Sequence, residues 1–242
     1  MHRSFEDDLD KLRTRLIRMG SLVEEQVELS FRAFLDNNAE LAKLIRDRDD
    51  KVDKLDIKID KQCQKIFALQ QPVARDLRLL LSALKINNEL ERIGDVAVGI
   101  SSMILDGYPM ADLAKEFNLD TMTKATYKMV KASLDAFVNN DPDLARHILP
   151  SDGKIDEMER SISADVVLAM KENPSLIERG VRFLEVLSKV ERMADHATNI
   201  AECVIFLIEA RMVRHLSVDE ILSQTGEVHN EADNDTYSDD GL

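Results

Sequence analysis

The chain contains one pattern twice: two helix-periodic arms on either side of a proline, with paired carboxylates at matching distances from it. In the first half, the midpoint of Asp53 and Glu91 is residue 72, and so is the midpoint of Asp49 and Asp95; Pro72 stands at that position. Residues four apart share a helix face, so a helical hairpin folded at the proline brings the two carboxylate pairs level. This symmetry limits the fold, because both arms must be helices of matching register.

The second half repeats the pattern. Asp152, Asp156, Glu191 and Asp195 are symmetric about position 173.5, beside Asn173-Pro174. A shift of 103 residues aligns the segments before the two turns, and a shift of 100 aligns those after them. The sequence therefore predicts a duplication of one helical unit of about 100 residues.

A longer amphipathic stretch precedes each hairpin, Leu9–Leu35 in the first half and Leu119–Val138 in the second. Apolar residues recur every three or four positions in these stretches and in the hairpin arms, which is the helical period. Gly and Pro interrupt the pattern at Asp106–Pro109. We therefore predict an all-α protein of two tandem three-helix bundles packed together, over residues 1–107 and 115–215, joined by a linker at 108–114.

The end of the chain differs from the rest in charge. The net charge is −14 at pH 7, and residues 217–242 carry eight carboxylates and no Lys or Arg, so the remainder carries −6. Such a composition cannot bury enough apolar surface to fold alone. We predict that residues 216–242 form a disordered acidic tail, with a short helix around Val218–Leu222 as an alternative. The acidic balance also argues against direct nucleic-acid binding, which needs surplus cations.

The cellular setting is predicted from what the sequence lacks. The N-terminus has no apolar run of a secretory signal, and no segment approaches the roughly 18 apolar residues of a membrane span. Cys63 and Cys203 lie in apolar helical patterns, which favours buried reduced thiols over a disulfide. These features predict a cytoplasmic protein.

The paired carboxylates are the strongest functional signal. Four carboxylates in one patch repel one another unless cations lie among them. Oxygen-only ligands on rigid helices suit hard cations such as Mg²⁺, Mn²⁺, Ca²⁺ or iron. The predicted metal ligands are Asp49, Asp53, Glu91 and Asp95 in the first hairpin and Asp152, Asp156, Glu191 and Asp195 in the second. Secondary candidates are Asp56, Glu159, His196 and Asn199.

Ordinary surface ion pairs are the competing interpretation, because Lys51, Arg92, Lys154 and Arg192 stand close by in the sequence. The recurrence of two levelled pairs in both halves favours metal binding. His196 follows Glu191 by five residues and so does not form the Glu-x-x-His motif of di-iron oxidases. No glycine-rich phosphate loop or nucleophilic triad is recognisable, so we expect no catalytic residues.

Two stretches resemble the signatures of the PhoU family of phosphate-signalling proteins: Pro72–Asp95 and Glu191–Glu202. The resemblance covers roughly residues 5–213 and implies two three-helix bundles that hold multinuclear metal clusters, with Mg, Mn, Fe and Zn as candidates. It implies a non-enzymatic cytoplasmic adaptor between the ATPase or permease subunit of a phosphate ABC transporter and the sensor histidine kinase of the phosphate regulon. Such an adaptor restrains the phosphate-starvation response. We further expect a homodimer that reaches the membrane only through these partners.

Two alternatives to the adaptor remain open: a carboxylate-ligated metal enzyme or metal buffer, and a scaffold whose carboxylates form only ion pairs. The two hairpins are also unequal, because His196 and Asn199 of the second correspond to Val96 and Gly99 of the first. We therefore predict the tighter metal cluster in the second hairpin.

Overall fold

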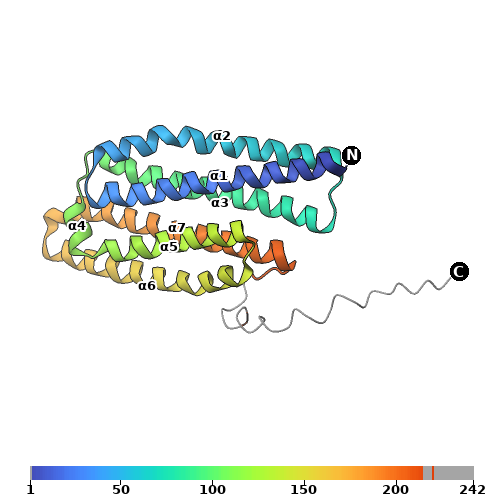
Figure 1. Ribbon diagram of the computed structural model, residues 1–242. Helices are drawn as coiled ribbons and strands as arrows, with labels where there is room; N and C mark the ends of the chain where they lie inside the picture. Colours follow the sequence, from blue (N-terminus) through green and yellow to red (C-terminus); the bar gives the residue numbers. More distant parts are fainter. Residues whose placement is uncertain (1, 215–219, 221–242) are drawn as a thin grey trace.

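The computed structural model describes residues 2–214 and residue 220, and within these residues it contains seven α-helices, one short 3-10 helix and no strand (Figure 1). The all-α prediction is confirmed. The elements are α1 (His2–Leu35), α2 (Ala39–Gln70), α3 (Ala74–Leu105), α4 (Ala111–Glu116), α5 (Leu119–Asn139), α6 (Pro142–Glu172), η1 (Pro174–Leu176) and α7 (Ile177–Glu209).

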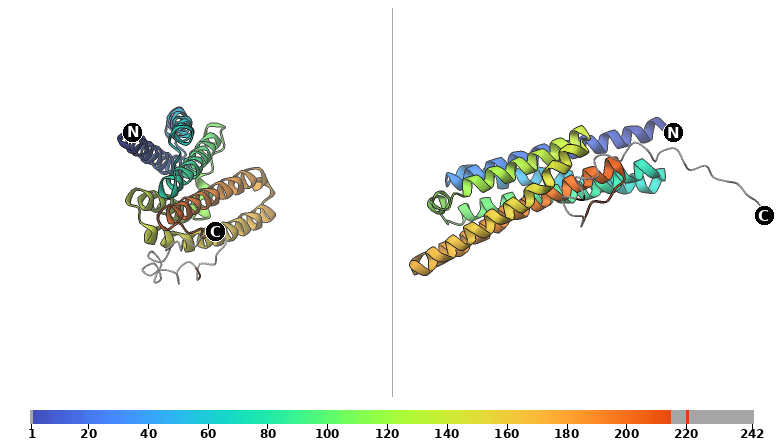
Figure 2. Two further views of the ribbon diagram at one scale, coloured as in Figure 1. Left: turned by 90° about the vertical axis from the view of Figure 1, so that its right-hand side faces the viewer. Right: turned by 90° about the horizontal axis from the view of Figure 1, so that it is seen from below.

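The helices form two bundles, α1–α3 and α5–α7, joined through α4 (Figure 1). The bundles meet mainly along α3 and α7, with a smaller contact between α1 and α5 (Figure 2). The two long hairpins turn at the predicted prolines: Pro72 lies between α2 and α3, and Pro174 opens the η1 turn between α6 and α7. The predicted pair of three-helix bundles is confirmed.

Side-chain caps explain why the polar breaks end one helix and begin the next. The Oδ1 atom of Asn38 accepts hydrogen bonds from the backbone N–H groups of Glu40 and Leu41, both at 3.1 Å. In the second bundle, Asp141 accepts from the N–H of Leu144 at 2.9 Å, and a proline fills the first helical position. Each cap satisfies backbone donors that have no partner inside the helix.

Two elements differ from the sequence prediction. Helix α1 begins at His2, seven residues before the predicted start, and the short helix α4 was not predicted. Leu113 and Ala114 of α4 are buried, so six residues that are too short to be stable alone become helical by packing against the bundles.

The apolar periodicity identified the core. Three methionines of the apolar helix faces, Met19, Met122 and Met193, are fully buried. Cys63 and Cys203 are buried free thiols, as predicted. The core residues of both bundles form one continuous cluster, because the facing sides of α3 and α7 bury their seams against each other.

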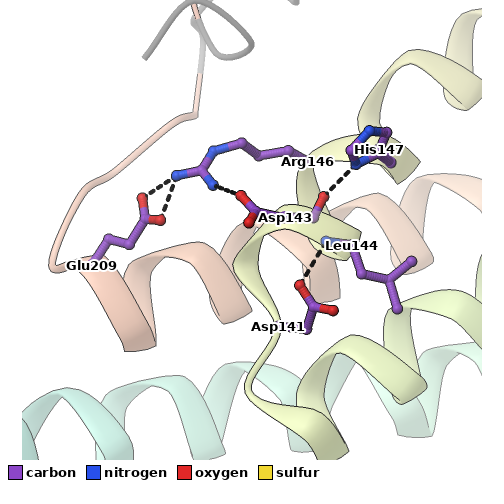
Figure 3. Close-up of polar contacts among 6 residues, drawn as sticks. All are labelled: Asp141, Asp143, Leu144, Arg146, His147 and Glu209. Carbon is purple, nitrogen blue, oxygen red and sulfur yellow. Dashed lines mark hydrogen bonds and ion pairs between the residues drawn. The ribbon is translucent and has the colours of Figure 1, made fainter. Parts of the chain in front are cut away.

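A buried ion pair fixes the end of α7 to the start of α6 (Figure 3). The guanidinium of Arg146, only 4% exposed, pairs with both carboxylate oxygens of Glu209 and with Asp143 at 2.7 Å. A buried guanidinium requires such partners, because an unpaired charge in the interior is costly.

Within the described residues, no helix is long and apolar enough to cross a membrane. The predicted disordered tail over 216–242 lies outside the described residues, apart from Glu220.

Candidate metal centre

The second hairpin brings three carboxylates to one point. Asp152 and Asp156 lie one turn apart on α6, and Asp195 lies on the facing side of α7; one oxygen from each falls within 4.8 Å of the others. Oxygens bound to a single cation at 2.0–2.6 Å are separated by similar distances. Ile155 and Ala194, beside the carboxylates in sequence, are buried, so the core fixes both helix faces.

Burial and mutual repulsion raise the pKa values of this group. Burial, followed by the charges of Asp195 and Asp156, raises the pKa of Asp152 to about 6. The pKa of Glu191 rises to about 7 by burial and by repulsion from Asp195, Asp156 and Asp152. The pKa of Asp195 is raised by burial and by Asp156. The fourth predicted ligand, Glu191, thus lies within electrostatic reach of the other three.

This donor set fits a divalent cation. The three carboxylates supply only oxygen ligands, and the raised pKa values of Asp152 and Asp195 indicate that negative charge is unfavourable in the metal-free site. A bound cation would remove that repulsion. The hydroxyl of Thr198 donates to Asp152 at 3.3 Å, which orients this carboxylate toward the cluster.

The first hairpin assembles the equivalent carboxylates less tightly. Burial raises the pKa of Asp49, as do the charges of Asp53 and Asp95. Burial also raises the pKa of Glu91, followed by the charges of Asp95, Asp56 and Asp53. These four residues are therefore close enough to influence one another's pKa values. In the described part of the chain, however, only Asp152, Asp156 and Asp195 of the second hairpin come within 4.8 Å as a group of three.

A buried glutamine contributes to this difference. Gln26 of α1, 3% exposed, donates its side-chain amide to Asp49 at 3.2 Å. Its own Oε1 has no hydrogen-bond partner among the described residues and lies beside Gly94, where an added Cβ would come within 3.2 Å of it. The second bundle has Met129 and Ala194 at these two positions. The first site therefore has a polar contact from a third helix that the second site lacks.

Two secondary candidates have protein partners. Asp56 accepts from the side-chain amide of Asn87 at 2.7 Å, and the same amide lies 3.2 Å from Asp60. Glu159 accepts from the hydroxyl of Ser163 at 2.8 Å. Both carboxylates still raise the pKa of the glutamate across the hairpin, so they lie at the edge of each acidic group.

The other two secondary candidates lie between the bundles. The Nδ1 atom of His196 is 2.7 Å from Glu89 of α3, and the amide of Asn199 donates to the same carboxylate at 3.2 Å. At the pseudo-equivalent place, Lys189 of α7 covers Gly99 of α3, where an added Cβ would lie 3.2 Å from its Nζ. In this conformation, His196 and Asn199 link the bundles through Glu89.

Three residues that contact the site were missed by sequence reasoning: Gln26, Asn87 and Thr198. A signal for them exists in the repeat alignment. Gln26 aligns with Met129, Asn87 with Leu187 and Thr198 with Val98. At each of these positions one repeat has a polar residue where the other has an apolar one. Buried polar side chains of this kind need a partner, which here is a carboxylate of the acidic group in each case.

The fold and the site together define a class: a duplicated helical-bundle protein with a group of carboxylates on each hairpin. Comparison with known proteins is consistent with this class. The model of the PhoU domain matches the chain twice, over residues 16–104 and 119–204. The chain belongs to the PhoU family, and the resemblance of its two signatures is confirmed.

Individual relatives match along almost the whole chain. The phosphate-specific transport system accessory protein PhoU homolog of Pseudomonas aeruginosa is 34% identical over 230 residues, covering 93% of this chain and 95% of the relative. The phosphate-specific transport system accessory protein PhoU of Escherichia coli K12 is 31% identical over 217 residues, covering 90% of each. The crystal structure of the Pseudomonas aeruginosa protein superimposes with a TM-score of 0.79, covering 86% of this chain and all of that one. The phosphate transport system regulatory protein PhoU of Streptococcus pneumoniae, 29% identical, gives 0.78 and covers 86% of this chain and 99% of that chain.

Proposed function

We propose that this protein is a metal-dependent accessory protein of a phosphate transport system. The proposal rests on one observation in a chain of the PhoU family: oxygens of Asp152, Asp156 and Asp195 lie within 4.8 Å of one another. The names of its relatives supply the process, phosphate-specific transport. The carboxylates supply the chemistry: when bound, a cation neutralises charges that the metal-free fold holds at an energetic cost.

The proposed role is that of an adaptor. Metal occupancy fixes the relative positions of α6 and α7 and removes negative charge from the surface where they meet. A surface whose charge depends on occupancy can discriminate between partners, because like charges placed opposite each other oppose docking. We expect the partners to be a subunit of a phosphate ABC transporter and the sensor histidine kinase of the phosphate regulon. Through them the protein restrains the starvation response, without catalysis, as a cytoplasmic homodimer.

Metal content tests the site. Wild-type protein, D152N/D156N/D195N and D53N/E91Q/D95N are purified in parallel, dialysed against Mg²⁺, Mn²⁺, Fe³⁺ or Zn²⁺, and analysed by elemental mass spectrometry. We expect bound metal in the wild type, loss of the second site in the first variant, and loss of the first site in the second variant. D165N, an exposed carboxylate change on the same helix as Asp152, is the matched control.

Partner binding tests the adaptor role separately. The transporter ATPase and the kinase encoded by the same genome are immobilised, and wild-type or variant protein is passed over them with metal or with chelator. The expected result is binding that requires both metal and the second-site carboxylates. Metal binding without any effect on either partner would leave a metal buffer in place of the adaptor.

A further inference from the structure

The second bundle has a groove between α5 and α6 that is absent from the first bundle. It has a volume of about 320 Å³, and its floor consists of Met129, Ile148 and Ile155, which are at most 5% exposed. Ala125 and Ala132 of α5 form one wall. Ser151, Lys154 and Ile155 line the groove, whereas their sequence neighbours Asp152 and Asp156 do not.

The same position in the first bundle is closed. There the space between α1 and α2 has a volume of about 10 Å³. The repeat alignment shows why: Leu22 and Leu29 fill the positions of Ala125 and Ala132. In addition, Glu25 and Arg48 form an ion pair of 2.5 Å across the opening, where the second bundle has Lys128 and Ser151.

The opened groove is basic at its rim. Lys128, His147 and Lys154 line it and are exposed, and Lys128 and Lys154 form no ion pair among the described residues. The groove thus combines two ammonium groups with an apolar floor, on a chain whose net charge is −14. This combination suits a segment that presents apolar side chains together with carboxylates.

We propose that the acidic C-terminal segment of this chain, residues 216–232, binds in the α5–α6 groove. Its sequence places Leu216, Val218, Ile221 and Leu222 around Asp219, with Glu227 and Glu231 further along, and it contains no Lys or Arg. The apolar side chains match the floor, and the carboxylates match the ammonium groups at the rim. The proposal does not depend on metal binding.

The end of α7 lies beside the start of α6, whose residues line one side of the groove. Glu209 at the end of α7 pairs with Arg146, and His147 at the groove rim is the next residue on α6 (Figure 3). Leu222 lies eight residues beyond Arg214, which an extended chain covers with up to roughly 26 Å. The groove residues of α6, from His147 to Met158, occupy about 17 Å of helix. The extended segment beyond Arg214 is therefore longer than the α6 side of the groove.

A single tryptophan reports this contact, because the chain has none. In L222W, we expect the tryptophan emission to be shifted to the blue relative to that of the denatured protein. The shift should persist on dilution, because the contact is within one molecule. Adding A125L/A132L fills the groove with the side chains of the first bundle. This variant should lower the docked-to-free ratio about tenfold or more, since burial of even one apolar side chain is lost.

K128E/K154E changes only exposed positions and is the second variant, so that misfolding of the filled groove would not obscure the result. It should also remove the blue shift, and added salt should weaken the shift in the parent protein. Absence of a shift in L222W, or a shift that neither variant changes, overturns the proposal. A shift that disappears on dilution overturns it in favour of docking between copies. Circular dichroism at 222 nm serves as the control for folding and should be the same in all of these proteins.

Discussion

Removal of charge from the second hairpin should stabilise the metal-free protein. Asp152 and Glu191 have raised pKa values, so the fold opposes their ionisation. Well below pH 3.8, the unfolded pKa of Asp152, both groups are protonated in the folded and unfolded states and cost nothing. As pH rises through about 6 to 7, the unfolded state has already lost protons that the folded state retains, so the stability of the wild type falls. D152N/E191Q lacks this penalty.

The size of the effect follows from the shifts. The pKa of Asp152 rises from 3.8 to about 6 and that of Glu191 from 4.5 to about 7. One pKa unit corresponds to about 1.4 kcal/mol, which gives about 3 kcal/mol for each group before screening. Both side chains are partly exposed, which about halves these values, and removal of one charge relieves the other. We expect D152N/E191Q to gain about 2 kcal/mol at pH 8, or roughly 4–8 °C in Tm.

Thermal unfolding followed by circular dichroism at 222 nm measures this gain, in chelator, from pH 4.5 to 8. The wild-type Tm should fall across this range more steeply than that of D152N/E191Q, and the two should converge at the acid end. D165N should follow the wild type. Adding Mn²⁺ or Mg²⁺ at pH 8 should reverse the order, because a ligand that binds only the folded state stabilises it by about 2.7 kcal/mol at one hundred times its Kd. Equal Tm values for wild type and variant in chelator at pH 8 would refute the electrostatic reasoning.

Three further predictions concern buried polar groups. E209Q should lose about 3 kcal/mol of unfolding free energy in urea titrations, because it leaves the charge of Arg146 with only an exposed partner. Q26M, which introduces the residue of the other repeat, should fold normally but raise the pKa of Asp49 further, as measured by NMR titration of the carboxyl carbon. Burial raises the pKa of Cys203 to about 12, so iodoacetamide at pH 8 should alkylate it more than tenfold more slowly in the folded than in the denatured protein.

The hairpins were predictable because their signal is local and repeated. Apolar periodicity fixes which face of each arm is buried, and the turn at Pro72 fixes the register in which the arms meet. Helix α4 was not predictable in the same way, since its six residues have no period long enough to detect and are held by packing. The start of α1 extends past the predicted Leu9 for a similar reason: Phe5 packs against the core although its neighbours are acidic.

The acidic groups were predictable as groups, but their internal geometry was not. Spacing places Asp49 level with Asp95, and the electrostatic coupling of these residues agrees with that placement. Spacing does not reveal that Gln26, from a different helix, donates to Asp49. Contacts between helices distant in the sequence depend on side-chain length and rotamer, which periodicity does not encode.

The sequence differences between the two signatures have a structural cause in the packing of α3 on α7. The repeat relates the two sides of this antiparallel pair, so position 89 faces 196 and 199 while position 189 faces 99. On one side a carboxylate, Glu89, meets His196 and Asn199. On the other side the long side chain of Lys189 needs the space that Gly99 leaves. The two sets of residues are matched pairs across an interface.

It follows that His196 and Asn199 are weak grounds for ranking the two metal sites. The ranking itself has better support elsewhere. Asp152, Asp156 and Asp195 converge within 4.8 Å, whereas no such group forms in the first hairpin among the described residues. If the convergence determines affinity, H196A/N199A should loosen the contact between the bundles but retain metal in the second site, because the three carboxylates remain in place. If the imidazole is itself a ligand, the same variant should lose the metal. Elemental analysis of this one variant therefore separates an interface role from a ligand role.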